Sequence, residues 1–196
     1  MVLRMNFLAS RYFVWALLFV PLLVFCWQYM TERLFYGEFI HITGDWSARL
    51  LILTLSVTPL RNLMPKQRWT AWLVRQRRYL GVAAFAYAVP HVVAYLVKLA
   101  DLARIVSEGV ELGMLTGWIA MLVFTALAVT SNNASVRKLG KRWKVLHRLV
   151  YAAAVLTFLH WILLAFDPLQ GYIHAGVLLA IQALRFVKRA KTVQAA

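Results

Sequence analysis

The chain has 196 residues and a mass of 22.5 kDa; 62% of its residues are hydrophobic and only 15% are charged. Soluble domains average roughly 45–50% apolar and about 25% charged residues, and a chain this small has too little interior to bury the excess. The composition excludes an ordinary soluble domain and indicates an integral membrane protein. The formal net charge of +15 then predicts basic cytoplasmic loops rather than nucleic-acid binding. A single cysteine, Cys26, excludes an intramolecular disulfide and any cysteine-based iron–sulfur or zinc site.

Six stretches without charged residues predict six membrane-spanning helices. A helix needs roughly 20 residues to cross the hydrocarbon layer, and five of the stretches have 17 to 25. The second has only 11, and it becomes a span if residues 45–49 lie at the membrane interface with Arg49 reaching out to water. We therefore expect an all-α integral membrane fold, a six-transmembrane-helix bundle, as a single domain over residues 1–196. The stretches are residues 12–31, 50–60, 79–97, 112–136, 149–166 and 168–184.

The charges are distributed unequally between the two sides of this predicted bundle. On one side lie 18 of the 22 Lys and Arg residues, and all seven acidic residues lie on the other. The positive-inside rule places the basic side, and with it both termini, in the cytoplasm. Arg4 and Arg11 precede the first span as they would precede a signal peptide, but the apolar run is too long and residues 26–29 make a poor cleavage site. We expect a retained helix there.

Two histidines lie inside the predicted spans at equal depth. His91 is seven residues before Lys98, and His160 is seven before Asp167, which puts each about 10 Å inside the outer face. Two imidazoles on two helices at one depth suit a b-type haem, whose iron takes one nitrogen from each side. The alternative from spacing alone is a pair of unrelated interhelical hydrogen bonds. His174 lies at a similar depth, so depth does not exclude it, whereas His41 is expected in a solvated outer loop.

A second group of residues marks the inner ends of the same two helices. His147 precedes His160 by 13 residues, and on a straight helix the two point some 140° apart. The two histidines can face the same interior of the bundle only if the helix bends between them, and the sequence shows no sign of a bend. Arg77 precedes His91 by 14 residues, within about 40° of the same helix face. An inner site near Arg77 and His147 suits a second haem, a quinone or a flavin phosphate. The alternative is that His147 merely lies at the membrane interface and Arg77 merely follows the positive-inside rule.

At these residues the chain resembles the ferric-reductase-like transmembrane family, and within it the haem-binding membrane subunits of bacterial methionine sulfoxide reductase systems. The similarity extends over about residues 44–188. It is carried by TPLR at 58–61, RRYLG at 77–81 and AFAYA at 84–88 ahead of His91. It continues with TS at 130–131 and RKLGKRWKVLHRLVY at 137–151, ahead of His160.

The resemblance implies a multi-pass b-type cytochrome of the bacterial inner membrane that holds one haem b or two, with FMN or a quinone as a further candidate cofactor. It would pass electrons from membrane quinol or a cytosolic flavin reductase to a periplasmic molybdenum-cofactor methionine sulfoxide reductase, MsrP, for repair of oxidised proteins. His91 and His160 fall on the family's iron-ligand positions. His147, Arg77 and Arg78 fall near the inner site. Apart from the resemblance, Tyr87 and Tyr95 lie four residues before and four after His91, on the same helix face, and with Tyr151 they are candidate supports of the haem pocket. His174 falls where the family requires no histidine.

The stretch between the third and fourth spans departs from the family. An Arg-Pro-Tyr-Ile/Leu-Thr sequence is expected there, and residues 108–116 read EGVELGMLT instead. Because this stretch lies on the outer side, where a partner would dock, a stand-alone haem-containing ferric or quinone reductase with another partner remains an alternative. A small membrane transporter or scaffold with incidental histidines is the second alternative.

Overall fold

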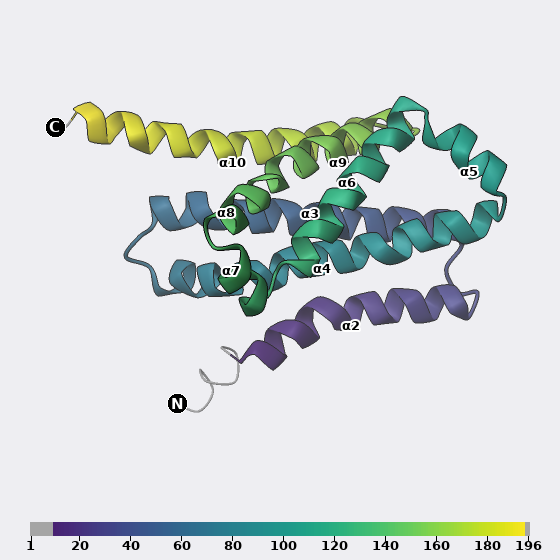
Figure 1. Cartoon of the computed structure of the whole chain (residues 1–196), viewed down its shortest axis with the longest axis horizontal. Coiled ribbons are helices and arrows are strands. Elements are labelled where there is room, and N and C mark those ends of the chain that lie inside the picture. Colours follow the sequence, from purple (N-terminus) through teal and green to yellow (C-terminus); the bar gives the residue numbers. More distant parts are fainter. Residues whose placement is uncertain (1–9, 195–196) are drawn as a thin grey trace.

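The computed structural model describes residues 10–194, with the side chains of residue 11 and residues 186–194 outside the description, and all regular structure in that range is helical. Arg4 and the side chains of Arg11, Lys188, Arg189 and Lys191, which contribute to the charge argument, lie outside the described residues. The described helices (Figure 1) are α2 (Arg11–Met30), α3 (Tyr36–Leu63), α4 (Arg68–Leu99), α5 (Leu102–Gly109), α6 (Leu112–Val129), α7 (Asn133–Leu139), α8 (Lys141–Arg148), α9 (Val150–Leu164) and α10 (Leu169–Gln194).

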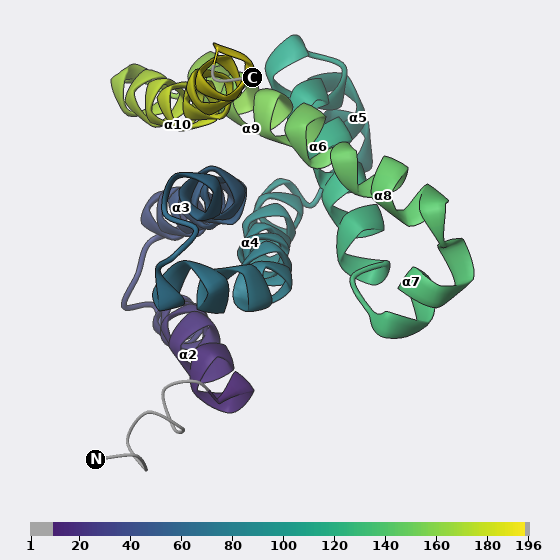
Figure 2. The ribbon, with the colours of Figure 1, turned by 90° about the vertical axis from the view of Figure 1, so that its left-hand side faces the viewer.

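Two helix pairs form the body of the bundle. Helix α3 packs along α4, and α6 packs along α9. The pairs meet where α4 contacts α6 and α3 contacts α9, while α10 lies on α3 and α9 and α2 lies on α4 (Figure 2). Leu51 and Leu55 of α3 are buried with Ala83 and Ala84 of α4. Small side chains such as these alanines let membrane helices approach closely.

Four of the described helical segments are long and apolar enough to cross a membrane: Tyr12–Met30, Arg68–Leu99, Leu112–Val129 and Lys141–Leu164. Helices α3 and α10 have 28 and 26 residues, about 42 and 39 Å at 1.5 Å per residue, but they are not among these four over the described residues. The prediction of an all-helical membrane protein is confirmed. The count of six spans stays a prediction.

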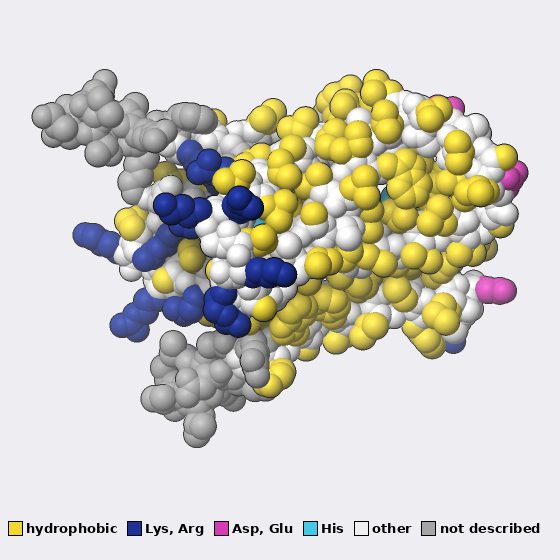
Figure 3. All heavy atoms as spheres, in the orientation of Figure 1, with side chains coloured by type: hydrophobic (Ala, Val, Ile, Leu, Met, Phe, Trp, Pro, Cys, Tyr) yellow, Lys and Arg dark blue, Asp and Glu magenta, His cyan; other side chains and the backbone are white. Residues whose placement is uncertain are grey.

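The surface of the bundle also fits a membrane. Large apolar side chains face outward along the helices; Leu17, Leu122 and Leu179 are each 63–71% exposed. In Figure 3 apolar atoms cover the middle of the visible face, Lys and Arg gather at one end, and Asp and Glu lie at the opposite end. Helix α2 begins and α10 ends at the basic end (Figure 1), so the described ends of the chain share one side as predicted.

The second predicted helix begins earlier than the sequence suggested. Helix α3 starts at Tyr36, because the Glu38 carboxylate accepts a hydrogen bond from the backbone N–H of Phe35 at 2.9 Å and caps the helix start. The prediction that His41 lies in an outer loop is therefore wrong: His41 lies within α3, and its side chain is exposed.

The fourth and fifth predicted helices are also divided differently. Helix α6 ends at Val129 rather than at residue 136, because Asn132 starts the new helix α7 by accepting the N–H of Ser135 at 2.8 Å. The fifth helix is interrupted at Leu149, between α8 and α9, and no side-chain hydrogen bond caps this junction. The backbone angles of Leu149 stay in the right-handed helical region, and Lys141–Leu164 forms one candidate span, so the interruption does not contradict the fifth predicted span, residues 149–166.

The outer connection between α4 and α6 contains a short helix, α5. The Asp101 side chain caps its start by accepting the N–H of Ala103 at 2.9 Å. Within it Arg104 pairs with Glu108 at 2.7 Å, four residues later. The atypical residues 108–116 thus span the end of α5 and the start of α6 and form ordered helical structure.

Candidate functional site

A cavity of about 370 Å³ lies between α3, α4, α6 and α9, toward the acidic end of the bundle. This volume is within the usual range of small-molecule and cofactor sites. The lining is mostly apolar, and its polar members include His91, His160, Tyr95, His41 and Asp45. Its apolar lining includes Ala48, Ala88, Ala120, Met121, Phe124 and Leu164.

His91 and His160 face each other across this cavity. His91 comes from α4 and His160 from α9, and their ring centres are 6.3 Å apart with the ring planes at 78°. Imidazole nitrogens bind transition metals at about 2 Å, so one metal ion fits between two rings at this separation. The sequence predicted that these two histidines share one depth, and the structure brings their rings together.

Both histidines are held by the same kind of hydrogen bond. The Nδ1 atom of His91 lies 2.9 Å from the carbonyl oxygen of Ile40 in α3, and Nδ1 of His160 lies 2.8 Å from the carbonyl oxygen of Gly113 in α6. A carbonyl oxygen only accepts, so in each ring Nδ1–H donates. The neutral ring then carries its free electron pair on Nε2, the atom that binds a metal.

The carbonyls of Ile40 and Gly113 were missed by sequence reasoning, because every residue has a carbonyl and none is marked by its side chain. The structure also adds two glycines, Gly44 and Gly117, against which the two histidine rings pack. A signal for Gly117 was present: an isolated glycine inside an apolar helix often has a packing reason.

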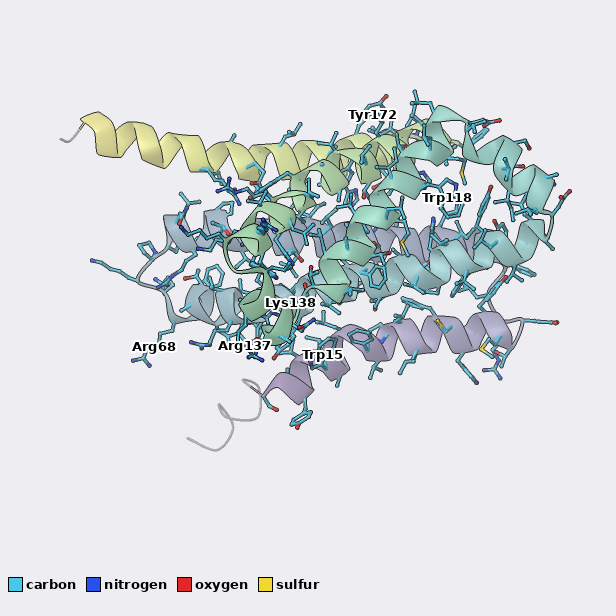
Figure 4. The ribbon with its side chains drawn as sticks, viewed as in Figure 1. Trp15, Arg68, Trp118, Arg137, Lys138 and Tyr172 are labelled. Atoms are coloured by element: carbon cyan, nitrogen blue, oxygen red, sulfur yellow. The ribbon has the colours of Figure 1, made fainter. Side chains whose placement is uncertain are left out.

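Tyr95 is the one predicted supporting tyrosine that lines the cavity. Its hydroxyl donates to the Glu108 carboxylate at 3.0 Å, and its ring meets the edge of Trp118 with centres 6.3 Å apart. Figure 4 places Trp118 near the α5 end of α6. The hydrogen bond from the Arg104 guanidinium, and then that from Tyr95, lowers the pKa of the Glu108 carboxyl below its usual value. These contacts fix the outer end of α4 to α5.

Tyr87 and Tyr151 lie elsewhere than predicted. Tyr87 is buried, and its hydroxyl donates to the carbonyl of Leu18 at 3.0 Å, which ties α4 to α2 rather than to the cavity. Tyr151 is exposed, and its hydroxyl accepts a 2.6 Å hydrogen bond from Arg185 of α10. Neither is among the residues that line the cavity, and their role as supports of the pocket stays a prediction.

The remaining histidine near this depth, His174, turns away from the cavity. Its Nδ1 bonds the carbonyl of Gln170 in its own helix at 2.7 Å, and its ring lies 5.1 Å from that of Trp161. It is not among the residues that line the cavity. His41, which the sequence set aside, lines the cavity instead.

The predicted inner residues lie near the basic end of the bundle, where Figure 4 shows Arg68, Arg137 and Lys138. Arg77 donates to the Thr58 hydroxyl at 3.3 Å, and Arg78 donates to the Asn133 side chain at 2.7 Å. Both arginines are close enough to His147 for their charges to act on it. The structure therefore brings the three predicted inner residues into one neighbourhood.

His147 has a different hydrogen-bond arrangement from the cavity histidines. Its ring stacks on Trp143 with centres 3.8 Å apart, and its Nε2 lies 3.0 Å from the Thr130 hydroxyl oxygen. That hydroxyl already donates its one proton to the Ala126 carbonyl at 2.7 Å, so it accepts from His147. Nε2 of His147 consequently carries a proton and is not free to bind a metal in this arrangement.

Comparison with known proteins adds the family. The model of the ferric reductase like transmembrane component matches residues 43–158. The chain is 40% identical over 154 residues to the protein-methionine-sulfoxide reductase heme-binding subunit MsrQ of Brucella anthropi, covering 76% of this chain and 68% of the relative. It is 38% identical, with the same coverage, to the subunits of that name from Brucella ovis and Brucella suis. No solved structure matches it. The chain belongs to the ferric-reductase-like transmembrane family and, within it, to the MsrQ subunits.

Proposed function

We propose that this protein is a haem b-binding electron-transfer subunit, in which His91 and His160 are the two axial ligands of one iron. The observation that carries the proposal is the pair of imidazoles facing each other at 6.3 Å across an apolar cavity. Each has its Nδ1 bound to a backbone carbonyl, so that Nε2 is the ligating atom. The names of the curated relatives, which are heme-binding subunits, point to the same cofactor.

Bound between these histidines, a haem supplies one-electron chemistry by alternating between ferric and ferrous iron. The chain's own residues supply the conditions for it. His91 and His160 hold the metal from two different helices, so that a bound group also links the α3–α4 pair to the α6–α9 pair. The apolar lining, with Ala88, Ala120 and Phe124, keeps water away from the iron and lowers the local dielectric constant.

In the proposed function, electrons enter the protein at the basic end of the bundle. Arg77, Arg78 and His147 form a polar, positively charged neighbourhood there, which suits the headgroup of a quinol or the phosphate of a flavin brought by a cytosolic reductase. The hydrogen bond that occupies Nε2 of His147 favours such a donor site over a second haem. With the basic end taken as cytoplasmic by the positive-inside rule, the cavity lies near the periplasmic face of the bacterial inner membrane that we propose for this protein.

The electron acceptor is proposed from the relatives' names, which assign them to protein-methionine-sulfoxide reductases. On this basis the acceptor is a periplasmic MsrP-like molybdoprotein that reduces methionine sulfoxide in oxidised proteins. The alternative is a stand-alone ferric or quinone reductase with another partner. The observation that favours it is the outer segment 108–116, which lacks the expected motif and contributes to an ordered helix beside the cavity.

A reoxidation experiment separates these two functions. The haem-loaded protein in lipid nanodiscs is reduced and its ferrous absorption is followed after mixing with MsrP, with and without methionine sulfoxide. We expect rapid reoxidation with MsrP, and turnover when the sulfoxide is added. Ferric citrate or a quinone without MsrP is the matched comparison. Reoxidation by these small acceptors, with none by MsrP, would replace the proposed acceptor with the alternative.

A further inference from the structure

Each of the two cavity histidines packs against a glycine of the neighbouring helix. A Cβ atom added at Gly44 of α3 would lie 3.2 Å from Cε1 and from Nδ1 of His91. A Cβ atom added at Gly117 of α6 would lie 2.5 Å from Nδ1, 2.7 Å from Cε1 and 3.1 Å from Cγ of His160. The two shorter distances at residue 117 lie below 3.0 Å, closer than Cβ atoms come to other heavy atoms in proteins, so a side chain there requires the imidazole or the helix to shift.

The glycine and the accepting carbonyl are related in the same way on both helices. Ile40, whose carbonyl receives Nδ1–H of His91, is four residues before Gly44, and Gly113, whose carbonyl receives Nδ1–H of His160, is four residues before Gly117. In an α-helix a carbonyl accepts the N–H of the residue four positions later. Each carbonyl therefore lies directly beside the glycine, where no side chain separates it from the imidazole. Each also accepts from a threonine hydroxyl three residues later, Ile40 from Thr43 at 3.2 Å and Gly113 from Thr116 at 2.7 Å.

The arrangement occurs once in each helix pair of the bundle. The α3–α4 pair holds His91 on Gly44, and the α6–α9 pair holds His160 on Gly117 (Figure 1). This repeated arrangement consists of only one glycine and one backbone carbonyl, so it is not visible as an internal repeat of the sequence. Two independent copies of the same geometry, meeting across one cavity, indicate a common task.

We propose that Gly44 and Gly117 are positioning residues that set the planes of the two axial imidazoles at a steep angle to one another. The proposal rests on the proposed haem function. Each ring is held on one side by the glycine surface and at Nδ1 by the carbonyl, and these two contacts restrict its rotation. The resulting angle between the ring planes is 78°.

The angle has a spectroscopic consequence. In a low-spin ferric haem, the angle between the two imidazole planes determines the energy difference between the two iron d orbitals that interact with the rings. Parallel planes separate these orbitals and give an ordinary rhombic EPR spectrum. Nearly perpendicular planes make them almost equal in energy and give a highly anisotropic spectrum with a large maximal g value. Hydrogen bonds to the ligands and their orientation also set the haem potential.

The test compares EPR spectra of the full-length, haem-loaded protein and glycine variants. The unchanged protein should show the highly anisotropic low-spin signal. Gly117→Ala should move the signal toward the rhombic type and weaken haem binding by about 10-fold or more, the range for loss of a ligand's supporting contacts. Gly44→Ala should change both properties in the same direction but less, because a contact at 3.2 Å needs only a small shift of the ring.

Two other glycines provide matched controls. Gly171→Ala introduces a contact of 2.9 Å with Cγ1 of Ile162, which is tighter than the 3.2 Å contacts at residue 44 and involves no histidine. Gly81→Ala makes an ordinary contact of 3.6 Å with the Thr54 methyl group. Both variants should retain the EPR signal of the unchanged protein.

The outcomes separate this inference from the proposed function. An unchanged protein without a bis-histidine low-spin signal would contradict the haem function itself. A rhombic signal from the unchanged protein, or spectra of Gly117→Ala and Gly44→Ala identical to those of the Gly171→Ala control, would overturn the glycine inference and leave the haem function standing. If Gly117→Ala does not accumulate, the milder Gly44→Ala decides in the same way.

Discussion

The two ends of this bundle use histidine in opposite ways. At the acidic end His91 and His160 give Nδ1–H to backbone carbonyls, which leaves Nε2 without that proton, and both residues line the cavity. At the inner end His147 gives Nε2–H to the Thr130 hydroxyl and stacks on Trp143. The comparison shows that the role of a histidine in this bundle depends on the hydrogen bond that each of its ring nitrogens makes. The depth and the spacing of a histidine in the sequence do not reveal that bond.

The largest effect that this comparison predicts follows from removing an outer histidine. His91→Ala or His160→Ala takes away one of two axial ligands, so we expect almost complete loss of bound haem, measured as the haem-to-protein ratio after purification. His174→Ala is the control, because His174 bonds within its own helix and should leave the ratio and the spectrum unchanged. Full haem occupancy in either cavity variant would contradict the assignment of the ligands.

A smaller effect is expected at the inner end. His147→Ala should leave the haem-to-protein ratio and the visible spectrum intact, because Nε2 of His147 is already occupied by a hydrogen bond. It should slow reduction of the haem by the inner donor, several-fold or more, since the imidazole lies in the donor neighbourhood with Arg77 and Arg78. Stopped-flow reduction with a quinol, and separately with a flavin reductase, measures this rate. Loss of half of the bound haem would instead make His147 a ligand of a second haem.

The smallest predicted effect concerns the outer helix α5. Arg104 and Tyr95 lower the pKa of Glu108, so the unfolded chain binds this proton more readily and the ion pair stabilises the folded connection at neutral pH. The stabilisation by Glu108 is fully present at pH values above the usual carboxyl pKa. It is lost as the pH falls through the lowered pKa of Glu108 in the folded protein. The protection factors of the α5 amides, which correct for the pH dependence of intrinsic exchange, should therefore stay constant down to about pH 5 and fall below it.

Glu108→Gln is the control for this pH effect, because the amide keeps the shape of the side chain without its titration. Its exchange in α5 should be faster at neutral pH and should show little further change in acid. Equal pH profiles for the two proteins would mean that other acidic groups control α5.

The fold was predictable where long apolar stretches alternate with charge, and less so at short polar connections. Helices α2 and α4 and the segregation of charge followed from composition and the positive-inside rule. The early start of α3 depends on one cap by Glu38, and the break at Leu149 has no side-chain cap at all. Local hydrogen bonds of this kind are weak signals in a single sequence.

The site was predictable in its side chains but not in its backbone. Equal depth and the family motifs singled out His91 and His160, and the structure places both on one cavity. The carbonyls of Ile40 and Gly113 became visible only with coordinates, because they depend on how neighbouring helices pack. Tyr87 shows the reverse: it shares a helix face with His91 by spacing, yet α2 lies close enough to take its hydroxyl.

The central claim is that one iron is held between His91 and His160. The most direct measurement is a reduced-minus-oxidised visible spectrum of the detergent-purified protein together with pyridine haemochrome quantification. We predict a shifted Soret band, sharp α and β bands of a low-spin b-type cytochrome, and one haem per chain. A protein that shows no haem absorbance after expression with ample haem would contradict the account, and the electron-transfer function would fall with it.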